Sequence, residues 1–145
     1  MRDLPRQLTA EELAELFEGK TRLVELLAET ESPLENARDV IATLSEEEKV
    51  EALSAHPAIG EKRLSARSAA EQGSDADPAV LSELAYLNQV YEEKFGFRFV
   101  VFVAGRPKRE ILKVLGERIG NTREKELDTG LRELVAIARD RWTRT

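Results

Sequence analysis

The chain contains a single histidine, His56, and imidazole is the side chain that ordinarily changes its protonation state close to neutral pH. Pro57 follows it, and because proline disfavours the α conformation in the residue before it, His56 is expected at the end of a helix. A histidine with a fixed backbone suits a general acid or base, which must be positioned before its pKa can be used. The structural alternative is a histidine favoured by the negative end of the helix dipole.

A hydroxyl and a carboxylate lie three residues apart at Ser68 and Glu71, and Gln72 follows them. On a helix these side chains would share one face. The same spacing is that of a capping box. Ser/Thr-x-x-Glu recurs along the chain, beginning at Thr9, Ser32, Thr43, Ser45 and Ser68. The pattern is therefore compatible with a catalytic carboxylate and also with an ordinary helix start.

Arg141 is a candidate for binding an anion. At about 100° per residue, the apolar side chains of the last helix occupy a sector of roughly 100°, and Arg141 lies about 70° from its centre. Arg132, Arg139 and Arg144 lie further round. A bidentate anion contact would be strongest near the buried stripe. The alternative is a cation that stabilises the helix C-terminus.

Composition excludes several classes of protein. The length of 145 residues fits one domain, with 41% hydrophobic and 34% charged residues. Asp and Glu number 28 against 22 Lys and Arg, giving a net charge of −6, which argues against nucleic acid and anionic membranes as partners. The chain has no cysteine and one histidine, so disulfides, a thiol nucleophile and a multi-histidine metal site are excluded. It shows neither an apolar signal sequence nor a membrane-spanning run, so a cytoplasmic protein is expected.

The dominant hydrophobic period is helical. Helices are predicted to begin at Thr9, at Ser32-Pro33 with Glu35 as the reciprocal capping partner, at Ser45, at Asp77-Pro78, at Pro107 and near Thr122. Short helices and loops are expected over 57–78, where glycine, serine and alanine are frequent. The fold class predicted is all-α: a single-domain multi-helix bundle over residues 1–145.

One segment, Phe97–Val103, has a different pattern, because it is rich in aromatic and β-branched residues, as strands are. No second run of this kind could pair with it, and a lone strand makes no stable sheet. If this short stretch near 97–103 is extended, its backbone groups need helix ends, water or a ligand as partners. The alternative is a buried continuation of the preceding helix.

Five stretches follow one another in an order more specific than any one of them. They are His56-Pro57-Ala-Ile-Gly60, Ser68-Ala-Ala-Glu71-Gln72, Leu87-Asn88-x-x-Tyr91-x-x-Lys94-Phe95-Gly96-Phe97-x-Phe99-Val100, Glu117-Arg118-Ile119-Gly120-Asn121 and Ile137-Ala138-Arg139-Asp140-Arg141. Together they resemble the OHCU decarboxylase family, the 2-oxo-4-hydroxy-4-carboxy-5-ureidoimidazoline decarboxylases of urate breakdown. The resemblance covers nearly the whole chain and is least distinctive over the first 40 residues.

The resemblance implies an all-α bundle, usually a homodimer, that works without a cofactor or metal. It implies a carboxy-lyase that converts the ureidoimidazoline substrate to (S)-allantoin and carbon dioxide. His56 matches the catalytic acid, Glu71 its neighbouring carboxylate, and Arg141 the arginine of the last helix. The positions that match the family's ligand-contacting stretches are Pro57, Ser68, Glu71, Gln72, Phe99, Val100, Val101, Phe102 and Val103.

The chain departs from the family's pattern in two places. Arg98 stands where the family usually has proline, which bears on how the chain enters the segment 97–103. Gly73-Ser74-Asp75 replaces the common run of small residues, which bears on the shape of that loop.

Two other functions are compatible with the residues. A non-catalytic helical interaction module would expose an apolar groove and disperse His56, Glu71 and Arg141 over its surface. A ureide hydrolase would use Glu71 to activate water, and would release ammonia or open the ring instead of releasing carbon dioxide.

Overall fold

The structure, a computed structural model, describes residues 3–59 and 77–144, and within them it contains seven α-helices and no strand. The helices are α1 Ala10–Phe17, α2 Arg22–Ala28, α3 Ala37–Ile41, α4 Glu46–Ser54, α6 Pro78–Phe95, α7 Lys108–Ile119 and α8 Arg123–Arg144. The all-α fold class is confirmed. None of these helices is long and apolar enough to cross a membrane.

Local capping explains where several helices begin. Thr9 and Ser45 each accept a hydrogen bond from the amide three residues on, and the Glu at that position bonds back, so α1 and α4 start with the predicted capping boxes. Asp77 caps α6, with Pro78 in its first turn. These three predictions are confirmed.

The prediction that a helix begins at Ser32-Pro33 is wrong. Ser32 has a φ of 49°, in the left-handed region, whereas an N-cap residue is normally extended. Residues 33–36 form turns, and α3 begins only at Ala37, after Asn36. The Ser-x-x-Glu spacing is present here, but the left-handed φ of Ser32 does not allow it to act as the N-cap of a helix.

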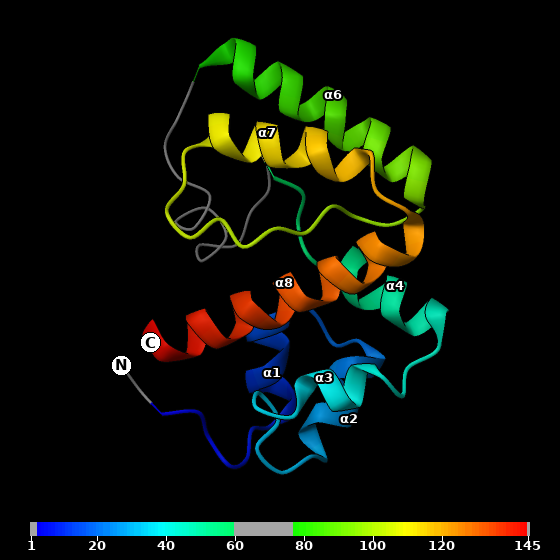
Figure 1. Cartoon of the computed structure of the whole chain (residues 1–145). Coiled ribbons are helices and arrows are strands. Elements are labelled where there is room, and N and C mark those ends of the chain that lie inside the picture. The colour runs from blue at the N-terminus through cyan, green and yellow to red at the C-terminus, as the bar shows by residue number, and fades with distance from the viewer. Residues whose placement is uncertain (1–2, 60–76, 145) are drawn as a thin grey trace.

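The long helix α8 lies between two groups of helices (Figure 1). On one side are α1 to α4, with α8 packed against α1, α3 and α4. On the other side α6 packs along α7. The core is continuous through both groups, and its largest fully buried side chains include Phe17, Leu53, Tyr91 and Phe99.

The predicted non-helical segment lies between α6 and α7. Gly96 ends α6 with a φ of 81°, which glycine adopts at little cost. Residues 98–103 then have neither helical nor strand hydrogen bonding, so the alternative of a continued helix is wrong. Four of them, Phe99, Val100, Val101 and Val103, are nevertheless buried; Phe99 and Val100 are each 1% exposed. A buried segment without a sheet must find other hydrogen-bond partners.

Candidate active site

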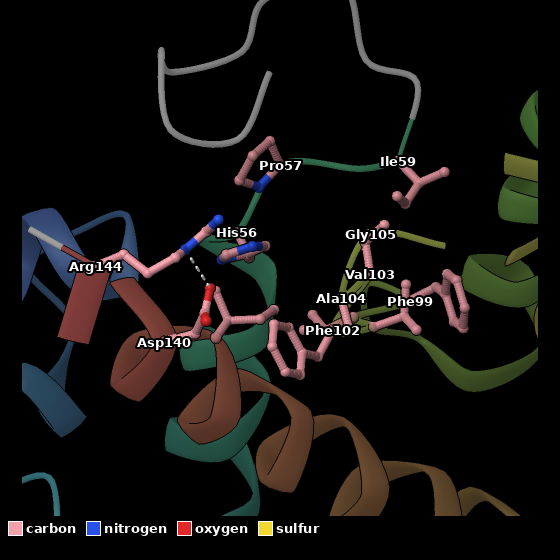
Figure 2. A pocket seen from close by; sticks show the side chains of 13 residues that line it. His56, Pro57, Ile59, Phe99, Phe102, Val103, Ala104, Gly105, Asp140 and Arg144 are labelled. Atoms are coloured by element: carbon pink, nitrogen blue, oxygen red, sulfur yellow. Dashed lines mark ion pairs between the residues drawn. The ribbon is translucent and has the colours of Figure 1, made fainter. Parts of the chain in front are cut away.

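A pocket of about 380 Å³ opens where the end of α4, the C-terminal half of α8 and the segment 99–105 meet. Figure 2 shows His56 and Pro57 on one side of it, Asp140 and Arg144 from α8 beside them, and Phe99 and residues 102–105 opposite. Among the described residues its lining is His56, Pro57, Ile59, Phe99, Val100, Val101, Phe102, Val103, Ala104, Gly105, Ile137, Asp140 and Arg144. Such a pocket is of a size to enclose a small molecule.

His56 lies just beyond the end of α4, as its proline neighbour predicts, and its amide donates to the carbonyl of Leu53 at 3.2 Å. The residue is 8% exposed. Its Nδ1 is buried and, within the described part of the chain, has no hydrogen-bond partner. An orphaned buried nitrogen is uncommon in proteins and marks a group that a ligand can satisfy.

The surroundings of His56 hold the imidazole neutral. Its pKa is lowered from 6.5 to about 4, chiefly because burial disfavours the charged form. The guanidinium of Arg141 lowers this pKa as well, the carboxylate of Glu18 raises it, and Arg98 lowers it. Among the described residues, burial and the two arginines thus outweigh the carboxylate of Glu18.

Side chains take the place of a sheet partner along the opposite wall. Arg118 donates to the carbonyl of Val100 at 2.7 Å, and Glu133 accepts from the amide of Phe102 at 3.2 Å. Arg106 donates to the carbonyls of Phe102 and Val103 at 2.6 and 3.1 Å. The predicted partners are helix ends, water or a ligand, so these side chains are partners that the sequence does not indicate.

Several amides of this wall remain available, and those of Val101 and Val103 are among them. Within the described residues, the N–H groups of Val101 and Val103 make no hydrogen bond. Both residues line the pocket and are nearly buried, at 6% and 4% exposure. Buried backbone donors are normally paired, so these amides are suited to a ligand with acceptor atoms along one edge.

The wall ends in a tight turn. Ala104 and Gly105 both have positive φ, 51° and 75°, and the amide of Arg106 donates to the carbonyl of Val103 at 3.0 Å. Two positive φ angles in the central positions are typical of a type I′ turn. The left-handed conformation is costly for Ala104, and such strain is common beside functional sites.

A buried charged cluster fixes the wall from behind. Glu126, which is fully buried, accepts from Arg118 and Tyr91 at 2.7 Å each and from Asn121 at 2.8 Å. Arg118 also lies over the ring of Phe99, with its guanidinium carbon 4.6 Å from the ring centroid. Burial and the bond to Glu126 raise the pKa of Tyr91, which keeps its hydroxyl protonated as a donor.

This cluster was not predicted as part of the site. Arg118 and Asn121 lie in one of the stretches that carry the family resemblance, so the motif was visible. What the sequence could not indicate is that both residues converge on Glu126 and that Arg118 reaches Val100, since this depends on how α6, α7 and α8 pack.

The predicted arginine, Arg141, is buried as its place on the helix predicts, at 2% exposure. Its Nη1 donates to the carbonyl of Leu16 at 3.0 Å and lies 3.1 Å from Oε1 of Glu18. It does not belong to the described lining of the pocket, but it is near enough to His56 to lower the pKa of the imidazole. His56 and Arg141 are both buried, unlike the dispersed surface residues expected of an interaction module.

Arg144 lines the pocket, although the helical period places it further from the buried stripe than Arg141. Its Nε pairs with Oδ2 of Asp140 at 3.0 Å, one helical turn back, and Figure 2 shows this pair beside His56. The period describes the side of α8 that packs on the core. It does not identify the residues that the pocket reaches at the helix end.

Arg98, the departure from the family's usual proline, contacts the histidine backbone directly. Its Nη1 donates to the carbonyl of His56 at 2.8 Å, and its Nε lies 3.5 Å from Oε1 of Glu92 on α6. Arg98 thereby links the segment to the residue that follows α4, through a side-chain contact that a proline could not make.

The remaining predicted site residues, Ser68, Glu71 and Gln72, lie outside the described residues, as does the departure at Gly73-Ser74-Asp75. Of the other predicted residues, the structure brings His56 and Pro57 together with Phe99, Val100, Val101, Phe102 and Val103 around one pocket. The arrangement offers a proton-transfer group, backbone hydrogen-bonding groups and nearby positive charge.

Known proteins resemble this chain in sequence and in fold. The family model for OHCU decarboxylase matches residues 2–143. A 2-oxo-4-hydroxy-4-carboxy-5-ureidoimidazoline decarboxylase from Halalkalicoccus jeotgali is 32% identical over 105 residues, which are 69% of this chain and 60% of that protein. The uric acid degradation bifunctional protein of Bacillus sp. (strain TB-90) is also 32% identical over 105 residues, 69% of this chain but only 21% of that longer protein.

The fold has a solved counterpart. A crystal structure of OHCU decarboxylase in the presence of (S)-allantoin superposes with a TM-score of 0.77 and 26% sequence identity, over 92% of this chain and 96% of that one. A crystal structure of (S)-allantoin synthase, at 24% identity and a TM-score of 0.69, shows the same fold. With the family model matching nearly its full length, the chain belongs to the OHCU decarboxylase family.

Proposed function

We propose that this protein is a cofactor-independent carboxy-lyase of urate and purine degradation, converting 2-oxo-4-hydroxy-4-carboxy-5-ureidoimidazoline to (S)-allantoin and carbon dioxide. The observation that carries the proposal is a buried imidazole with an unpartnered nitrogen, on one side of a small pocket whose other side is backbone with free amides. Membership of the family supports the same reaction.

The reaction needs orientation and one proton. When the bond between the ring carbon and the carboxylate breaks, carbon dioxide leaves and the electron pair moves into the adjacent unsaturated ring. The anionic substrate plus one proton thus gives neutral allantoin plus carbon dioxide. Because the substrate itself accepts the electron pair, no pyridoxal, thiamine or metal is required for this step.

His56 is the group that supplies the proton, with Glu71 as its neighbouring carboxylate. At neutral pH the imidazole of the free protein is uncharged, because its pKa is about 4. The negative charge of the incoming carboxylate favours imidazolium, so substrate binding and proton uptake are coupled. His56 then acts as a general acid toward the developing enamine-like system.

The other residues orient the substrate. The free amides of Val101 and Val103 suit the carbonyl oxygens of the ring and the ureido arm. Pro57 and Phe99 bound the pocket beside His56. We infer that Ser68 and Gln72 contribute polar contacts, and that Arg141, the positive charge buried beside the imidazole, holds an oxygen or the carboxylate.

The test generates the unstable substrate in place from urate, with urate oxidase and hydroxyisourate hydrolase. Circular dichroism then follows the appearance of optically active allantoin. Acceleration over the spontaneous decay to racemate is expected. No acceleration would favour an interaction module, and release of ammonia without carbon dioxide would favour a ureide hydrolase.

The first variant to assay is His56→Asn, which keeps a polar side chain of similar size but cannot donate a proton as an acid. The rate is expected to fall by at least about a hundredfold, the usual size of a lost acid–base contribution. Thermal unfolding checks that the variant folds. Decarboxylation at the parent rate by a folded variant would contradict the role of His56.

The homodimer, the cytoplasmic location and the single domain over residues 1–145 are predictions from the sequence and its resemblance. Light scattering after size-exclusion chromatography measures the first, with twice the mass of 16.3 kDa expected. A mass of one chain at micromolar concentration would contradict it.

A further inference from the structure

We propose that Arg98 is a positioning residue for His56: its guanidinium joins the two walls of the pocket and sets the distance between the imidazole and the backbone of residues 99–103. The kinetic part of this inference rests on the proposed decarboxylase function. The structural part does not, because it concerns where the histidine lies in the free protein.

The contacts of Arg98 span three elements. The residue stands at the start of the segment whose next residue, Phe99, is 1% exposed and lines the pocket. From there Nη1 donates at 2.8 Å to the carbonyl of His56, which lies 42 residues earlier, beyond the end of α4. Nε lies 3.5 Å from Oε1 of Glu92 on α6, which orients the guanidinium from its other side.

The carbonyl that Arg98 binds has few alternative partners. His56 lies beyond the last turn of α4, and no backbone amide of the described residues donates to its carbonyl. A hydrogen bond from a charged donor is stronger than one between neutral groups. The side chain of Arg98 is 25% exposed, so solvent only partly competes for this contact. The bond therefore fixes the backbone from which the imidazole extends.

Arg98 also acts on the charge of His56. Among the described residues, the charged groups that affect the imidazole are Arg141 and Glu18, from α8 and the end of α1, and Arg98 itself. Asp140 and Arg144 of α8 line the same pocket as an ion pair. Removing the charge of Arg98 should make the imidazolium easier to form. That change alone would help a general acid at neutral pH, so a loss of rate on its removal indicates displaced geometry.

Two substitutions separate the charge from the hydrogen bond. Arg98→Met removes both, and Arg98→Lys keeps the positive charge but loses the planar guanidinium that can contact His56 and Glu92 together. The matched control is Arg123→Met. Arg123 donates to the carbonyl of Phe95 at 2.9 Å and pairs with Glu46 at 2.5 Å, so it makes the same kinds of contact outside the pocket lining.

His56 is the chain's only histidine, so selective labelling of histidine gives one NMR signal for each labelled nucleus. The 13C resonance of its carbonyl reports the hydrogen bond, and a pH titration of the ring reports the imidazole. In Arg98→Met we expect the carbonyl resonance to move and the titration midpoint to rise. In Arg98→Lys the carbonyl resonance moves while the midpoint stays near the parent's, and in Arg123→Met neither changes.

Kinetics complete the test. Arg98→Met should lower kcat by about tenfold to a hundredfold with a smaller change in KM, because a misplacement of about 1 Å in a reacting group costs this much. Arg98→Lys keeps the charge without the guanidinium contact, so its kcat should fall at least as far, and Arg123→Met should retain parent kcat. Thermal unfolding of all three identifies any variant that fails to fold, in which case Arg98→Lys carries the test.

An unchanged carbonyl resonance in a folded Arg98→Met or Arg98→Lys would overturn the inference, as would parent kcat in Arg98→Met. If the parent protein does not decarboxylate the substrate, the proposed function fails. The NMR comparison then still decides whether Arg98 positions His56.

Discussion

At the scale of the residue, the position of His56 has a thermodynamic consequence. A histidine that ionises freely in the unfolded chain but resists protonation in the folded one couples folding to pH. Above pH 6.5 the imidazole is neutral in both states and contributes no pH dependence. As the pH falls below 6.5, the unfolded chain takes up a proton that the folded protein takes up only near pH 4, so acid destabilises the fold.

The predicted size of this effect is about 3 kcal/mol between pH 6.5 and 4, at about 1.4 kcal/mol per unit difference in pKa. Urea unfolding of the parent and of His56→Gln, measured across this range, isolates it, because the carboxylates of the two proteins are the same. The parent should lose more stability on acidification than the variant. Parallel pH profiles would mean that the pKa of His56 is not depressed in the folded protein.

At the scale of the element, the segment 98–103 is held in place by a neighbouring charged cluster. Arg118 and Glu126 form a buried pair at 2.7 Å, and Arg118 also holds the carbonyl of Val100. Removing one partner of a buried pair leaves the other charge buried without compensation, which costs more than the intact pair contributes. The geometry of this pocket wall therefore depends on residues that do not line it.

We expect Arg118→Met to lower the free energy of unfolding by about 3–5 kcal/mol. The control is Arg132→Met, which breaks the exposed pair that Arg132 makes with Asp128 on α8 at 3.2 Å, where a loss of no more than about 1 kcal/mol is expected. Chemical denaturation measures both. Equal losses in the two variants would indicate that the pair at Arg118 is effectively solvated.

The helix starts show which parts of the fold can be predicted from local sequence. Capping boxes such as those at Thr9 and Ser45 are local, so their residues predict the helix starts directly. Ser32 has the same spacing but does not begin a helix, because its φ is left-handed and the motif does not encode that conformation.

The residues of the site likewise divide into those that the sequence predicts and those that it does not. His56 is predicted from its residue type and its proline neighbour, and Pro57 and residues 99–103 from the resemblance to the OHCU decarboxylase family. The structure places them around one pocket. The contacts of Arg98 with His56 and of Arg118 with Glu126 were not predicted. Each depends on how separate elements pack, and neither the hydrophobic period nor a local motif contains that information.

At the scale of the whole molecule, the position of His56 depends on how closely α4 packs on α8. A Cβ at Gly130 of α8 would lie 3.1 Å from Cδ2 of Leu53 on α4, and Leu53 is fully buried. A larger residue at position 130 therefore requires the Leu53 side chain or the two helices to shift. His56 follows α4, while Asp140 lies on α8, so this change would alter the pocket from a distance.

Gly130→Val is expected to destabilise the protein by about 1–3 kcal/mol, the usual cost of overpacking a core, and to lower kcat. Gly116→Val is the matched control, because Gly116 is also within a helix but a Cβ there meets nothing within 4 Å. Thermal unfolding and the allantoin assay compare the two. Equal behaviour of both variants would mean that the packing of α4 on α8 tolerates the added volume.

The amide groups of Val101 and Val103 lead to a last consequence. A ligand that is bound by backbone N–H groups does not depend on which apolar side chains those residues carry. Apolar substitutions along this wall should therefore leave ligand binding intact. Alanine scanning would not detect the contribution of these amides to binding. Replacing a single amide with an ester would detect it, because this change deletes one N–H and leaves every side chain in place.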